Sequence, residues 1–290
     1  MNDGDGAARE DAHLQRILAQ AVLPGERWAY GEHPGQAAEL YGDAAAAETL
    51  VVFLHGGYFR ESIPLDHARP LAAALAEAGA AVALVEYRRA GPAARGQGSR
   101  GPGAHDPGPH DPGAGGTTAP SPGAGGHPRT LEDVRACLGA ILRGESPWGP
   151  LGGRRLVVAG HSAGGSLALS WASWQEAEGP SAVVVALAPV SDLVEEARQG
   201  LAGGAVAQYL GCLPDEDLRP YLAEDPRSRA ALIPERIGVR VVHGTEDATV
   251  DIAFSRRFPA PCTELEGADH FDLIDPSSPH FAAVRRALGV

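Results

Sequence analysis

Lysine is absent from the sequence: all 24 basic residues among its 290 are arginine. We interpret this absence as part of a compositional bias that also enriches alanine, glycine and proline, and we assign it no function. Acidic residues number 37, which gives a formal net charge of −13 at pH 7. Such a chain would be repelled by a nucleic acid or an anionic membrane, so neither is an expected partner.

Cysteine is scarce, and long apolar runs are missing. Cys137, Cys212 and Cys262 are odd in number and widely spaced, which argues against a disulfide framework and a cysteine zinc site. No run of about 18 apolar residues could form a transmembrane helix. The start, MNDGDGAARE, is too polar for a secretory signal. We therefore expect a soluble, cytoplasmic protein, and the length predicts one large α/β domain over 1–290.

Short β-branched runs alternate with longer segments rich in alanine and leucine. This alternation predicts the α/β class, with a mostly parallel central sheet flanked by helices. Strands are expected at 49–55, 81–87, 154–160, 182–190 and 239–244, and helices at 65–80, 130–144, 163–177 and 279–290.

Two segments interrupt the alternation. Residues 91–128 are dense in glycine and proline, a composition that buries too little apolar surface to offset chain entropy, and they predict a disordered insert. Its histidines, His105, His110 and His127, are expected to be solvated rather than to bind a metal. Residues 191–236 are acidic and helical and lie between two predicted strands. A small helical cap over an active site would be inserted at such a place, although a plain surface excursion is the alternative.

The stretch VVAGHSAGGSL, residues 157–167, joins a predicted strand to a predicted helix. That context is typical of a nucleophile elbow, in which a serine occupies a strained turn. Ser162 is the candidate nucleophile, and Gly160 and Gly164 are expected there because a Cβ would collide with neighbouring backbone. Glycine is so abundant in this chain that G-x-S-x-G alone could arise by chance. The assignment therefore depends on partners elsewhere in the sequence.

LHGGYFR, residues 54–60, supplies the first partner, at the end of an earlier predicted strand. A nucleophilic serine needs donors for the oxyanion that its attack creates. Glycines allow close backbone approach, so the N–H groups of Gly56 and Gly57 are candidate donors. The N–H of Ala163, the residue after the nucleophile, is the third.

The general base and its orienting carboxylate are expected downstream, in the chain order Ser, acid, His. His270 lies in a loop before the last predicted helix and is the candidate base. Asp247 directly follows the turn that ends a predicted strand and is the favoured acid. Its competitors are Asp251, Asp269 and Asp272.

The remaining histidines lack this placement. His55 and His161 belong to the two motifs and are expected to brace their turns. His243 lies inside a predicted strand.

These pieces together resemble the α/β-hydrolase family, and within it the branch with an H-G-G-x-W oxyanion motif that includes kynurenine formamidases. The matching segments are HGGYFR, EYRRAGP, HPRTLEDVRACL, GHSAGGSLA, HGTEDATV and DHFDLID. They cover most of the chain from Ala38 onward. Phe59 departs from the branch, since it stands where the motif usually has tryptophan and lacks the indole N–H. The insert 91–128 also departs, because relatives have a short loop there.

The resemblance implies the α/β-hydrolase fold with a Ser-His-Asp triad and an arylformamidase-like activity on an N-formyl arylamine of the N-formylkynurenine type. Ser162 would attack the formyl carbon, His270 would transfer the proton, and Asp247 would orient the imidazole. No metal or organic cofactor is expected.

Substrate contacts and alternative functions remain open. Tyr58, Phe59 and Phe271 are candidates for contact with the aromatic ring of the substrate, and core packing is the alternative for each. A small-acyl carboxylesterase with the same triad is the alternative function, and a hydrolase fold that only binds a ligand is a third. The expected partner is a small aromatic amide or ester, and a homodimer is left open.

Overall fold

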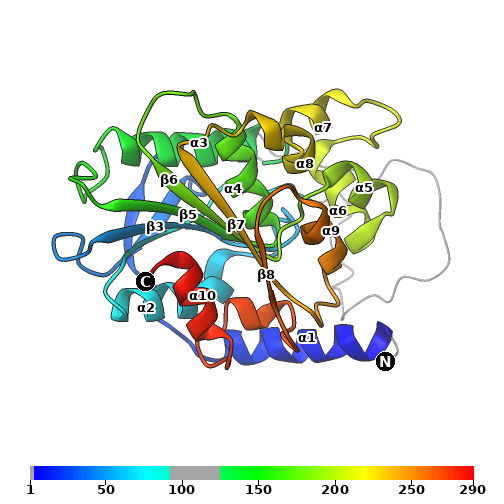
Figure 1. Cartoon of the computed structure of the whole chain (residues 1–290), viewed down its shortest axis with the longest axis horizontal. Helices are drawn as coiled ribbons and strands as arrows, with labels where there is room; N and C mark the ends of the chain where they lie inside the picture. The colour runs from blue at the N-terminus through cyan, green and yellow to red at the C-terminus, as the bar shows by residue number, and fades with distance from the viewer. Residues whose placement is uncertain (1–2, 92–124) are drawn as a thin grey trace, which may run out of the picture.

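The computed structural model describes residues 3–91 and 125–290 of the chain. Residues 92–124, most of the predicted insert with His105 and His110, lie outside the described residues. The described strands form a single sheet in the order β1-β2-β4-β3-β5-β6-β7-β8 (Figure 1). They are β1 (Glu26–Ala29), β2 (Ala37–Tyr41), β3 (Thr49–Leu54), β4 (Ala81–Val85), β5 (Arg155–His161), β6 (Ala182–Leu187), β7 (Ile237–Gly244) and β8 (Cys262–Leu265).

The central strands are parallel and almost wholly apolar. Every residue of β3 and of β4 is buried, as expected for strands covered on both faces. Leu54 of β3 pairs with Gly160 of β5, and Leu187 of β6 pairs with His161 of β5 and with Val242 of β7. The carboxyl ends of these strands therefore meet at one edge of the sheet. The loops that carry the candidate site residues leave from that edge, where ligands bind in open α/β sheets.

Helices cover both faces of the sheet in two layers (Figure 1). One core cluster packs under α3 and α4, and the other packs under α1, α2 and α10. The mostly parallel sheet between helices confirms the predicted fold class. The helices are α1 (Asp3–Leu18), η1 (Leu65–Ala68), α2 (Arg69–Glu77), α3 (Arg129–Leu142), α4 (Ala163–Ser173), α5 (Leu193–Arg198), α6 (Leu201–Leu210), α7 (Arg219–Glu224), α8 (Pro226–Arg229), η2 (Ala230–Leu232), α9 (Ile252–Arg257), η3 (Phe271–Leu273) and α10 (Phe281–Leu288).

Strands β1, β2 and β8 and helices α1, α9 and η3 were not predicted from the sequence. Strands β1 and β2 add an antiparallel edge to the parallel sheet. Helix α1 runs along the lower side of the molecule, next to the loops that follow β7 and β8 (Figure 1). The segment 191–236, predicted as a cap, folds into the short helices α5 to α8 and η2.

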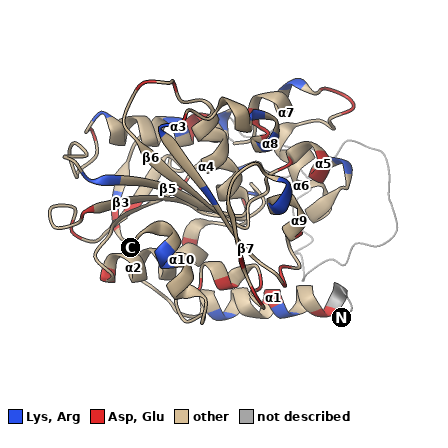
Figure 2. Ribbon diagram, in the orientation of Figure 1, with Lys and Arg blue, Asp and Glu red and all other residues tan. Residues whose placement is uncertain are grey.

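Figure 2 shows acidic and basic segments intermingled on the outer helices and loops, with no face of one sign in this view. No helix among the described residues is long and apolar enough to cross a bilayer.

Candidate active site

Ser162 occupies a strained turn between β5 and α4. Its backbone has φ 55° and ψ −121°, a combination that residues with a side chain adopt only where the surrounding structure enforces it. The flanking glycines are required by space. A Cβ on Gly160 would lie 2.2 Å from the carbonyl oxygen of Gly164, and one on Gly164 would lie 2.1 Å from that of Leu54. The G-x-S-x-G spacing thus holds the candidate nucleophile at the carboxyl edge of the sheet, where it is 3% exposed.

The loop after β3 passes directly against this turn. A Cβ on Gly56 would lie 3.2 Å from Cβ of Ser162, so any larger residue there would crowd the serine turn. The next three residues, Gly57, Tyr58 and Phe59, all have left-handed backbone angles. The N–H groups of Gly56, Gly57 and Ala163 donate no hydrogen bond to any described residue. These three candidate oxyanion donors are therefore unpaired among the described residues.

Aromatic packing and polar contacts with α6 hold the loop after β3, residues 55–60, from behind. We call this segment the oxyanion loop. The Phe59 ring is 1% exposed and stacks on Tyr209 of α6, with ring centroids 4.1 Å apart. Arg60 Nη2 donates to the carbonyl oxygen of Ala202, at 2.6 Å. These observed contacts of Phe59 are core packing, and its contact with a substrate stays a prediction.

Tyr58 and Phe271 are only partly buried. The Phe271 ring meets the His270 ring edge to face, with centroids 5.2 Å apart and an interplanar angle of 87°.

His270 and Asp247 are hydrogen-bonded to one another. His270 lies in the loop between β8 and η3, is 2% exposed, and directs Nδ1 to Oδ2 of Asp247 at 2.7 Å. The side chain of Asp247 has no exposed surface. The competing carboxylates have other partners: Asp251 caps α9 by accepting from Ala253 N, Asp269 contacts His13, and Asp272 accepts from Asp269 N. Among the four candidate acids, the structure brings Asp247 to the candidate base.

Four donors surround the Asp247 carboxylate. Besides His270, His243 Nε2 lies 3.1 Å from Oδ2, and the N–H groups of Thr249 and Val250 donate to Oδ1 at 2.9 and 2.7 Å. Burial alone would raise the pKa of Asp247, but His270 and the hydrogen bond from His243 outweigh burial and hold this pKa well below its usual value. Asp247 is therefore an anion across the neutral range.

The environment of His270 favours its protonated form. Burial alone would lower the pKa of His270, but the facing Asp247 carboxylate, with Glu10 and Asp269, raises it above the ordinary value. Such a group can accept a proton and be stabilised as a cation, which a general base in nucleophilic catalysis requires.

Two further histidines support the loops of the site. His161 Nε2 donates to the carbonyl oxygen of His270 at 3.0 Å, and burial lowers the pKa of His161 far enough to keep its ring neutral. His55 Nδ1 lies 2.7 Å from the carbonyl oxygen of Gly56, and His55 Nε2 lies 3.0 Å from Glu86. Each histidine thus ties a motif backbone to its surroundings.

Helix α1 contributes residues that the sequence analysis did not select. Its buried face carries Glu10, His13 and Ile17, and the Glu10 carboxylate accepts from the backbone N–H of His270. The available signal was the helical spacing of three and four residues. Two of the three residues are polar, however, so no apolar stripe was present to mark the helix.

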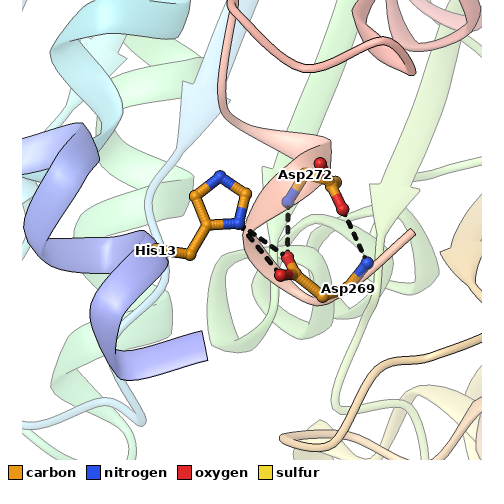
Figure 3. A group of neighbouring side chains, drawn as sticks. All are labelled: His13, Asp269 and Asp272. Atoms are coloured by element: carbon orange, nitrogen blue, oxygen red, sulfur yellow. Dashed lines mark hydrogen bonds and ion pairs between the residues drawn. The ribbon is translucent and has the colours of Figure 1, made fainter. Parts of the chain in front are cut away.

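His13, Asp269 and Asp272 gather closely enough to suggest a metal site (Figure 3). Their atoms already satisfy one another. His13 Nδ1 lies 3.0 Å from both oxygens of Asp269, His13 Nε2 lies 3.0 Å from Asp275, and Asp272 accepts from the backbone N–H of Asp269. The hydrogen bond to Asp269 is the main reason that the pKa of His13 is raised. The cluster is therefore explained as a hydrogen-bonded joint between α1 and the His270 loop.

Comparison with known proteins identifies the fold. No family model matches the sequence, and no curated protein matches it. One similar solved structure is an esterase/lipase from an uncultured bacterium, at 17% identity and a TM-score of 0.61, covering 96% of this chain and 88% of that one. Another is Esterase B from Lactobacillus rhamnosis, at 18% identity and a TM-score of 0.64, covering 98% of this chain and 92% of that one. A putative thioesterase from Silicibacter sp. TM1040 is also similar, at 20% identity and a TM-score of 0.59, covering 97% of this chain and 93% of that one. At these identities the likeness shows the fold alone, and it confirms the predicted α/β-hydrolase fold.

Proposed function

We propose that this protein is a serine hydrolase that cleaves small-acyl esters. The observation that carries the proposal is the combination of Ser162 at the strained turn after β5 with the buried His270–Asp247 pair. The esterase titles of structures with the same fold support an ester as the substrate. The unpaired N–H groups of Gly56, Gly57 and Ala163 supply the oxyanion donors that acyl transfer requires.

The chemistry follows from the proton positions. Asp247 accepts the Nδ1 proton of His270, which leaves the lone pair on Nε2. This nitrogen takes the proton of Ser162 as Oγ attacks the acyl carbon, and the oxyanion is held by the three backbone N–H groups. The imidazolium then donates its proton to the departing alcohol. A water molecule, deprotonated by the same nitrogen, releases the acid from the acyl-enzyme.

The burial of the site supports a small acyl group. Ser162 is 3% exposed and His270 is 2% exposed, so the reacting side chains are largely closed off from solvent. Behind the oxyanion loop, the buried ring of Phe59 stacks on that of Tyr209.

Hydrolysis of an N-formyl arylamine is the second candidate. It is favoured by Phe271, whose partly exposed ring packs edge to face against the imidazole of His270. In this mechanism His270 protonates the leaving group. Formyl is the smallest acyl group, and an aryl amine could pack on the Phe271 ring and on Tyr58. The resemblance of HGGYFR and DHFDLID to the formamidase motifs points the same way.

One set of rate measurements tests both candidates. For the parent and Ser162→Ala, kcat/KM is measured on aryl formate, acetate and butyrate esters and on N-formylkynurenine. Ester turnover should fall by roughly 10³ or more in the variant, because only binding and the oxyanion donors would remain. Ester turnover within tenfold of the parent would contradict the role of Ser162. Hydrolysis of the formamide, with a steep fall from formyl to butyryl, would favour the second candidate, and butyrate turnover without formamide turnover would exclude it.

A further inference from the structure

The carboxylate of Glu10 joins the two loops that carry the acid and the base. Glu10 lies on α1 and is 2% exposed. Its Oε1 accepts from the backbone N–H groups of Ala248, at 2.8 Å, and His270, at 3.1 Å. Its Oε2 accepts from the hydroxyl of Thr249, at 2.6 Å. Ala248 and Thr249 directly follow Asp247, so one side chain fixes both ends of the Asp247–His270 hydrogen bond.

Helix α1 is held in place by a second contact on the same loop. One turn after Glu10, His13 points from α1 to Asp269, as Figure 3 shows, and its other nitrogen reaches Asp275. These carboxylates lie on either side of His270 in the sequence. Arg9 also pairs with Glu246, but that pair is exposed and contributes little. Glu10 therefore acts from a helix whose position is set by buried contacts.

We propose that Glu10 is a positioning residue of the hydrolase, which keeps the loop after Asp247 and the backbone of His270 at the spacing that their hydrogen bond requires. This inference rests on the proposed function. Glu10 touches neither the reacting atoms nor the imidazole nitrogens, so it acts through Asp247 and His270.

The charge of Glu10 gives this role a measurable signature. Its carboxylate adds to those of Asp247 and Asp269 in raising the pKa of His270. His243 contacts the same oxygen of Asp247 as His270, and His13 pairs with Asp269. The rings of His161 and His67 also lie near His270, and burial lowers the pKa of both, that of His67 to about 3. The rings of His161 and His67 are therefore neutral near pH 7. Removing the Glu10 charge should therefore lower the pKa of His270.

Glu10→Gln is the test variant and Asp11→Asn is its matched control. Glutamine keeps an acceptor for the two backbone N–H groups but removes the charge. Asp11→Asn removes the same charge at the next residue, which lies on the exposed side of α1. We expect kcat on an aryl acetate to fall about tenfold in Glu10→Gln, with KM little changed, because the hydrogen bonds to both loops lose the strength that the charge gives them and the catalytic groups are held less firmly in place. The acidic limb of its pH profile should move to lower pH. Asp11→Asn should match the parent in both.

The outcomes separate this inference from the proposed function. A parent that neither hydrolyses esters nor reacts with a fluorophosphonate at Ser162 would overturn both. An active parent, with Glu10→Gln equal to Asp11→Asn in kcat and in pH profile, would overturn the role of Glu10 alone. If Glu10→Gln fails to fold by circular dichroism, Thr249→Val removes the hydroxyl that donates to Oε2 and that also contacts Tyr58. An unchanged kcat in Thr249→Val would then overturn the inference, and a lowered kcat with native KM would support it.

Discussion

Replacement of Asp247 by asparagine changes one atom and should leave the fold intact. The Oδ1 site accepts two backbone N–H groups, from Thr249 and Val250, so the amide oxygen of the asparagine must occupy it. The amide NH₂ then takes the place of Oδ2, facing His270 Nδ1 and His243 Nε2. Because NH₂ can only donate, His270 has to turn its Nδ1 lone pair toward it and carry the proton on Nε2.

The size of the effect follows from this tautomer. A protonated Nε2 cannot accept the proton of Ser162, and the buried anion that stabilises the imidazolium is lost as well. Both losses act on the transition state, so kcat should fall on the order of 10⁴, as in other triads altered in this way. That factor corresponds to about 5 kcal/mol in activation free energy.

Hydrolysis of an aryl acetate, followed by release of the aryl alcohol, measures this loss. Asp251→Asn is the matched control, because Asp251 follows the same strand but its carboxylate caps α9. The control should keep kcat within a fewfold of the parent. A loss below tenfold in Asp247→Asn, or a larger loss in Asp251→Asn, would refute the assignment of the acid.

Two further predictions concern stability. Burial raises the pKa of Glu196 to about 8, so the folded protein keeps a proton that the unfolded chain releases above the ordinary glutamate pKa of 4.5. The free energy of unfolding should therefore fall as pH rises from 4.5 to 8. In Glu196→Gln the free energy of unfolding, measured by urea titration at pH 4.5 and pH 8, should change less with pH than in the parent. An equal change with pH in the variant and the parent would contradict this prediction. Shortening 98–124 to a few glycine and serine residues should change the free energy of unfolding by about 1 kcal/mol or less, because the cost of closing a loop varies slowly with its length. The end of the segment is also fixed by the hydrogen bond from Gly125 N to Arg89 O, at 2.9 Å. A collapse of kcat/KM in the shortened protein would show that the segment acts on the site.

The sheet was predictable from sequence because its strands are buried on both faces. TLVVFLH and AVALVEY were predicted as strands at 49–55 and 81–87, and they form β3 and β4 with small differences at their ends. β1 and β2 gave no such signal. The residues of β1 are mostly exposed, and an edge strand of four residues carries no periodic pattern that a sequence could reveal.

The candidate site was only partly predictable. The turn around Ser162 could be located because its geometry requires glycine at fixed positions, and such requirements are visible in a sequence. Asp247 was favoured over Asp251, Asp269 and Asp272 because it directly follows the turn that ends a strand, but spacing alone did not exclude the other three. Their hydrogen-bond partners distinguish them. Glu10 could not be found at all, because its role depends on contacts with residues more than 230 positions away.

The contact between α1 and the His270 loop has a consequence for biosynthesis. Glu10 and His270 are 260 residues apart in the chain. At translation rates of 5–20 residues per second, α1 leaves the ribosome roughly 10–50 seconds before its partner loop is made. Until residues 248–270 are made, the Glu10 carboxylate lacks one or more of its three donors. A nascent chain therefore completes the site last, and it does so only when the polypeptide has been extended past His270.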